Sequence, residues 1–206
     1  MAKTFNDLTD DQKKNFHAQV TALGLSPQDV AGHVVADGKP GAHPGAARSP
    51  IKTRSLTVQN LAHFKQLGGI PDERYQVKGH SDAHIAYPPP IPESRLRLLK
   101  AAGVRDSLQR ALTPEEHGKV GAAVHAFVNG DSSKVPDHLV ELAEAQQFPI
   151  EAAAGGAQDL TISGPFTIQG PGPVALVFGT ITIKPGGYIV CQCDAKISAQ
   201  VITNES

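Results

Sequence analysis

The sequence predicts an α+β fold in which a set of short helices precedes a small antiparallel β-sheet. All nine histidines lie within residues 1–150, whereas residues 151–206 contain none and alternate apolar with polar residues as strands do. Turn-forming glycines and prolines separate the apolar stretches of this tail. We therefore expect two regions, a helical region over residues 1–150 and a β module over residues 151–206.

Two helices of the first region are marked by residues that cap a first turn. Residues 9–12, Thr-Asp-Asp-Gln, form a capping box and predict a helix to about Leu23, which Gly24 would end. Residues 113–116, Thr-Pro-Glu-Glu, combine a cap, a proline at the first helical position and two acids at the positive helix end. Apolar residues at helical spacing follow both starts, so each helix is expected to bury one face.

Weaker local patterns predict further helices and two long connectors. Ser26 and Pro27 indicate a short helix that would bury Val30 and Val34. The spacing of apolar residues predicts other helices over residues 57–67, 92–103, 104–112 and 136–147. The connectors, residues 36–54 and 69–92, together hold eight of the sixteen prolines. Connectors of this length are usually functional or without regular structure.

Six short strands are expected in the β module, over residues 160–163, 165–169, 174–178, 180–184, 188–193 and 196–203. The apolar alternation changes parity at Gly179, which predicts a bend or bulge. Residues 184–187, Lys-Pro-Gly-Gly, fit a type II turn with a glycine at positive φ. A small sheet with one apolar face needs a cover, so we expect a sandwich, a jelly-roll-like fold or a short solenoid, packed on the helices or on a second copy.

Composition indicates which partners to expect. The apolar face and the edges of the β module favour self-association, so a homo-oligomer is expected. A net charge of −1 argues against a nucleic-acid partner. No apolar run approaches the length of a membrane span, and the first residues lack the apolar core of a secretory signal. The sequence therefore predicts a cytoplasmic protein without a membrane span.

Residues 79–84, Gly-His-Ser-Asp-Ala-His, hold the strongest candidate for a chemical site. In an extended segment His80, Asp82 and His84 would point to one side, and two imidazoles with a carboxylate suit zinc or iron. The alternative is a solvated polar loop, because a short histidine pair without a second ligand cluster is a frequent false match. Apart from zinc or iron at this cluster, no cofactor is expected.

Other motifs have structural explanations. Cys191 and Cys193 are expected to be buried small apolar residues whose thiols point the same way from a strand. Residues 170–175 match the pattern G-x-G-x-x-A but lead into a strand, which argues against a dinucleotide site. The acids at Glu115 and Glu116 serve the start of a helix, so proton transfer to the neighbouring His117 is not needed to explain them.

Three hypotheses about function follow from these patterns. The first is a non-catalytic assembly or binding protein whose C-terminal β module mediates oligomerisation or binds a partner or ligand. The alternative is a metal-dependent enzyme built around His80, Asp82 and His84. A third is a toxin or effector whose β part docks on a target or inserts into it. The sequence leaves open whether the protein is an enzyme.

Overall fold

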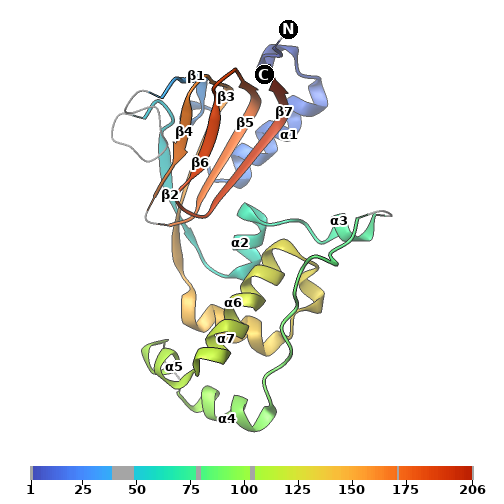
Figure 1. Ribbon diagram of the computed structural model, residues 1–206, viewed down its shortest axis with the longest axis vertical. Helices are drawn as coiled ribbons and strands as arrows, with labels where there is room; N and C mark the ends of the chain where they lie inside the picture. The colour runs from blue at the N-terminus through green and yellow to red at the C-terminus, as the bar shows by residue number, and fades with distance from the viewer. Residues whose placement is uncertain (1, 39–48, 78–79, 103–104, 171, 206) are drawn as a thin grey trace. The chain divides into compact units, whose positions relative to one another are not determined.

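The computed structural model describes residues 2–38, 49–77, 80–102, 105–170 and 172–205 (Figure 1). Its contacts divide the chain into two compact units. One unit joins Met1–Thr57 to Glu151–Ser206 and carries most of the strands, and the other, Val58–Ile150, is helical. In the described part of the chain, no helix has both the length and the apolar character needed to cross a membrane.

The fold class is α/β, and the antiparallel C-terminal sheet expected from the sequence is wrong. Strand β5 (Val174–Ile183) pairs in parallel with β3 (Ile150–Ile162) on one side and with β7 (Ala195–Asn204) on the other. Strand β4 (Pro165–Ile168) pairs in parallel with β6 (Tyr188–Cys191) in a second sheet. Alternation marks a half-buried strand but says nothing about the direction of its neighbour. Each short turn leads the chain into the other sheet instead of closing a hairpin.

The chain therefore winds as a coil whose passes stack on one another. Ala153 lies beside Val174, and Val174 lies beside Ala195, which gives a repeat of 21 residues. One wall of the coil contains β3, β5 and β7, and the other contains β4 and β6 (Figure 1). Strands β1 (Ala31–Ala36) and β2 (Thr53–Val58) both pair with β3. The buried core side chains are Val34, Ala36, Ile51, Ala157, Leu160, Ile162, Phe166, Ile168, Val174, Leu176, Phe178 and Ile181.

The outer face of β5 is covered by helix α1 (Asp10–Ala22) and the 3-10 turn η1 (Phe5–Asp7). The predicted capping box is confirmed, since the Thr9 hydroxyl accepts a hydrogen bond from the Gln12 amide. The Phe5 ring lies where a side chain at position 179 would stand, so Gly179 leaves it room. Asp159 Oδ1 holds this segment in place by accepting hydrogen bonds from the Phe5 amide at 2.7 Å and the Thr180 hydroxyl at 2.6 Å.

Two local predictions had opposite outcomes. The type II turn is confirmed, because Gly187 N donates to Lys184 O at 2.9 Å and Gly186 has φ of 82°. The helix predicted to bury Val30 and Val34 is wrong. Only a single turn, η2 (Pro27–Asp29), forms there, and β1 follows it. Pairing with β3 decides the conformation of the valines in β1, whose branched side chains suit a strand.

The helical unit contains six α-helices within its described residues. They are α2 (Leu61–Gly68), α3 (Glu73–Gln76), α4 (Glu93–Ala102), α5 (Arg105–Ala111), α6 (Pro114–Asn129) and α7 (Asp137–Gln147). The 3-10 turn η3 (Ser132–Lys134) follows α6. The predicted start of α6 is confirmed by a reciprocal cap between Thr113 and Glu116. Helix α2 begins later than predicted, because Asn60 caps it and residues 53–58 form β2.

The connector over residues 69–92 is held by polar contacts to the end of α6. Lys65 Nζ donates to Asp72 Oδ1 at 2.6 Å and to the carbonyl oxygens of Phe127 and Gly130 at 2.8 and 2.7 Å. Asp72 also accepts hydrogen bonds from the amide and the hydroxyl of Ser132. These contacts fix the start of the connector, around Asp72, to the end of α6.

Candidate functional site

The predicted metal ligands His80, Asp82 and His84 are not brought together as a ligand set. His80 and His84 are exposed. Among the residues that the structure describes, no three His, Cys, Asp or Glu side chains are grouped so as to hold a metal ion. The zinc or iron hypothesis stays a prediction, which elemental analysis of the purified protein would test.

Asp82 instead links the connector to the segment after α6. Its carboxylate accepts a hydrogen bond from Lys134 Nζ at 2.7 Å and another from the Tyr87 hydroxyl. The contact with Lys134, followed by the one with Tyr87, lowers the pKa of Asp82. The Tyr87 hydroxyl in turn accepts from the Asp131 amide at 2.7 Å, and burial raises the pKa of Tyr87. The Asp82 carboxylate therefore forms an ion pair with Lys134 that joins the connector to the segment after α6.

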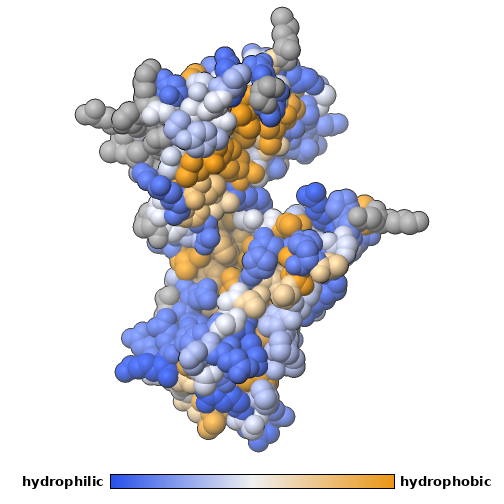
Figure 2. Space-filling model, viewed as in Figure 1, coloured by the Kyte–Doolittle hydropathy of each residue, from blue (hydrophilic) through white to orange (hydrophobic). Residues whose placement is uncertain are grey.

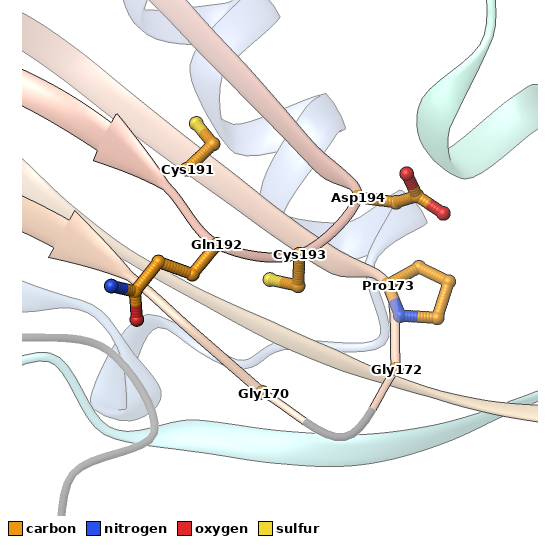
Figure 3. Close-up of a pocket in the computed structure, with 7 residues that line it drawn as sticks. All are labelled: Gly170, Gly172, Pro173, Cys191, Gln192, Cys193 and Asp194. Carbon is orange, nitrogen blue, oxygen red and sulfur yellow. The ribbon is translucent and has the colours of Figure 1, made fainter.

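The two cysteines lie beside an open pocket of about 670 Å³ in the coil unit (Figure 3). The pocket is lined by Gly170, Gly172, Pro173, Cys191, Gln192, Cys193 and Asp194. Cys191 is exposed, Cys193 is half-buried, and their thiols point in different directions (Figure 3). The expectation that both are buried and parallel is wrong, because β6 ends at Cys191 and the chain then turns into β7, so strand periodicity no longer applies.

The chemistry of this pocket does not favour nucleophilic catalysis. Burial raises the pKa of the Cys193 thiol, and the nearby Cys191 and Asp194 add to the effect. A thiol that keeps its proton is a weak nucleophile. None of the seven lining residues is a histidine, a lysine or an arginine that would stabilise a thiolate. What distinguishes this region is its position at the last pass of the coil.

The last pass exposes side chains whose counterparts in earlier passes are buried. Leu160, Ile181 and Ile202 occupy one register position on β3, β5 and β7. The first two are each 1% exposed, whereas Ile202 is 63% exposed. In the other wall the fully buried Ile168 stands beside the exposed Cys191. In the earlier passes, the side chain at each of these positions is covered by the following pass of the coil. In the described residues no pass follows β7, so Ile202 and Cys191 are left exposed.

The backbone at this end is also open. Among the described strands, β7 pairs only with β5, and β6 pairs only with β4. Each therefore has an outer edge without a strand partner, and such edges pair readily with other chains. We call the surface formed by β6 and β7 the open end. Figure 2 shows apolar surface across the region where Figure 1 places these strands.

The open end has few of the charges and prolines that usually protect a sheet edge, although α1 contacts β7 and Gln19 accepts a hydrogen bond from Gln200 there. Between residues 188 and 204 the only charged side chains are Asp194 and Lys196, and there is no proline. Lys196 is half-buried, and this burial lowers its pKa. Natural edges are blunted by exposed charges, prolines or bulges, which discourage pairing with another chain. An edge with one partly buried lysine is suited to accept a strand.

Sequence reasoning missed Ile202 as a surface residue of this site. Strict alternation along residues 196–203 predicts that Ile197, Ala199 and Val201 share the apolar face and that Ile202 does not. The structure places Ile202 in register with the core residue Ile181, because the offset of 21 residues between β5 and β7 is the same before and after Gly179. The signal that would have revealed it is the 21-residue repeat, which aligns position 202 with position 181.

Comparison with known proteins identifies no relative that would assign a role to the open end. The chain matches no model of a protein family, and no curated protein or solved structure is significantly similar to it.

Proposed function

We propose that this chain is a non-catalytic assembly or binding protein, and that a partner binds at the open end by adding strands to β6 and β7. The observation that carries the proposal is the exposure of Ile202, whose counterparts in the two preceding passes are buried. Burying Ile202 as its counterparts are buried requires another layer of chain against β7.

Strand addition is an established mode of recognition in which the main chain supplies the hydrogen bonds and side chains supply specificity. Strand β7 offers ten residues for such pairing. The partly buried Ile197 and Ala199 add apolar area next to Ile202. Covering this area supplies the hydrophobic contribution that backbone hydrogen bonds alone lack.

The two free thiols favour a reducing compartment for this function. Cys191 is exposed and Cys193 is half-buried, and neither is in a disulfide. Thiols persist in the cytoplasm, whereas oxidising compartments favour disulfides. We therefore place the protein in the cytoplasm as part of the same proposal.

A peptide that copies residues 195–204 tests the proposed function. Labelled with a fluorophore, it should bind the protein saturably in an anisotropy titration, at a dilution where light scattering reports a monomer. Binding should weaken at least about tenfold in the Ile202→Lys variant, because a buried unpaired charge costs more than 1.4 kcal/mol. If light scattering reports an oligomer at every dilution, so that no free monomer is present for the titration, the proposal is also supported.

The matched control is Val35→Lys, which adds the same charge to an exposed apolar position on β1 of the same sheet. This variant should bind the peptide as the wild type does. A monomer that does not bind the peptide would contradict the proposal. Equal peptide affinity in the Ile202→Lys variant would place binding elsewhere.

A further inference from the structure

The open end presents two strand edges at once, and this restricts what can cover it. Strand β7 ends one wall of the coil and β6 ends the other. Facing sheets lie about 10 Å apart. A single added strand would cover one edge and leave the other, together with the apolar layer between them, in water. The occupant must therefore bring two strand edges at the same spacing.

We infer that the occupant is a second copy of this chain, joined end to end about a twofold axis perpendicular to both walls of the coil. This inference rests on the proposed function and names its partner. Such an axis reverses the strand direction and keeps each wall in place. It therefore pairs β7 with β7 and β6 with β6, both antiparallel, in a single operation. A second copy has the required spacing because its end is identical.

Charge and apolar stacking favour this pairing. The two charged residues of the open end, Asp194 and Lys196, have opposite signs, so identical ends carry no net charge against each other. The stack of Leu160, Ile181 and Ile202 continues into the partner, where the exposed Ile202 meets apolar side chains of the same layer. Each copy thus covers β6 and β7 of the other, as a further pass of the coil would.

The area of the open end is sufficient for a stable dimer. Ten strand residues extend roughly 33 Å, and two walls with their side chains measure about 20 Å across. An end of this size buries on the order of 700 Å² per chain, or about 1,300 Å² in total. This area lies in the range of specific interfaces and above that of most crystal contacts.

The opposite end of the coil does not match the open end, which argues against a filament. Its outer edge is divided between β1 and β2, which both pair with β3 and have 6 residues each, whereas β7 is one continuous strand of 10 residues. At the start of the other wall, Asp37 and Gly38 lie against Gly164 and Pro165. Head-to-tail stacking would place the continuous strand β7 against an edge that is interrupted between β1 and β2, whereas end-to-end pairing joins two continuous strands. A closed dimer is therefore the expected assembly.

Light scattering at increasing protein concentration gives the first test. The wild-type chain should change from monomer to dimer and form nothing larger. The Ile202→Lys variant should weaken the dimer about 30-fold or more, because each copy would bury an unpaired charge in an apolar layer. Tyr188→Lys, which alters a residue 54% exposed on β6, should weaken it independently. Val35→Lys, which retains both edges of the open end, should dimerise as the wild type does.

Spin labels measure the strand direction across the interface. In a background of Cys191→Ser and Cys193→Ser that still forms dimers, single cysteines replace Ser198 or Asn204 and carry the label. Antiparallel pairing centred on residues 199 and 200 places identical labels about 10 Å apart at position 198 and about 30 Å apart at position 204. Parallel head-to-tail stacking would give one similar distance at both positions.

Each outcome decides between the inference and the function on which it rests. A dimer with the unequal label distances supports both. A monomer at all concentrations that still binds the peptide of residues 195–204 overturns the second copy and leaves strand addition in place. A monomer without peptide binding overturns both. A dimer that is insensitive to both lysine substitutions, or that has equal label distances, overturns the end-to-end arrangement.

Discussion

In the helical unit, charged side chains form hydrogen bonds with the backbone groups at helix ends. In the coil unit, neighbouring strands instead pair each other's amides and carbonyls, up to the outer edges of β6 and β7. Lys65 donates to two carbonyl oxygens after and within the last turn of α6, and Glu116 accepts from the amide that begins the same helix. Strands β6 and β7 have no strand partner on their outer edges among the described residues.

This difference follows from the geometry of the two structures. A helix leaves its unpaired amides and carbonyls at its two ends, within reach of a side chain. In a sheet, the unpaired amides and carbonyls lie on the outermost strand, along its full length. A few side chains can therefore pair the free backbone groups of the helical unit, whereas those at the edges of the coil need another strand. Three measurements would break or sharpen this comparison.

The largest effect is expected for Lys65→Met in the helical unit. The lysine side chain is only 10% exposed, and its loss leaves Asp72 without its cation and the Phe127 and Gly130 carbonyls without their donor. The free energy of unfolding should fall by about 3–5 kcal/mol. Urea unfolding followed by circular dichroism measures the change.

Lys100→Met is the control for this prediction. Lys100 pairs with Glu141 at 3.1 Å, and both side chains are more than half exposed. An exposed ion pair contributes below about 1 kcal/mol. Equal losses in the two variants would show that closure by a buried charge does not stabilise the helical unit.

The second effect is a pH dependence that arises from Glu116. The guanidinium of Arg95 contacts both carboxylate oxygens, at 2.7 and 2.9 Å, and with the Thr113 amide lowers the pKa of Glu116 to about 2. Because the pKa is lower in the folded chain, this contribution is complete above about pH 4.5 and is lost as the pH falls toward about 2. The expected loss is about 2–3 kcal/mol.

Comparison with Glu116→Gln isolates this contribution from the other carboxyl groups. The variant should be less stable near neutral pH, and the difference from the wild type should shrink as the solution is acidified through about pH 4. Urea unfolding at a series of pH values provides the measurement. A difference that stays constant over this pH range would mean that the Arg95 contact does not act through the charge of Glu116.

The smallest effect is expected for Gly179→Ala in the coil. A Cβ atom there would lie 2.3 Å from the Phe5 ring and 2.6 Å from the Gln158 carbonyl oxygen, so the N-terminal segment would have to move. The free energy of unfolding should fall by about 2 kcal/mol. Gly32→Ala on β1, where no atom lies within 4 Å, is the control and should change little. A stable Gly179→Ala variant would show that the packing of Phe5 on β5 is loose.

Local chemistry made several elements predictable. The caps at Thr9 and Thr113 and the turn at Gly186 depend on residues within a few positions of one another. The parallel pairing was not predictable in this way, because β3 and β5 meet across a 21-residue repeat that alternation does not reveal. The Asp82 contact was missed for the same reason, since its partner Lys134 lies 52 residues away in the sequence.

The sequence by itself determined where α1 and α6 begin, where the turn over residues 184–187 lies and that strands follow residue 160, because capping, turn geometry and apolar periodicity act over a few residues. Only the tertiary structure decided that the strands run parallel and that Ile202 is left uncovered. Strand direction and burial depend on which distant segment lies alongside, and among the described strands β7 differs from β3 and β5 in having a neighbour on one side only.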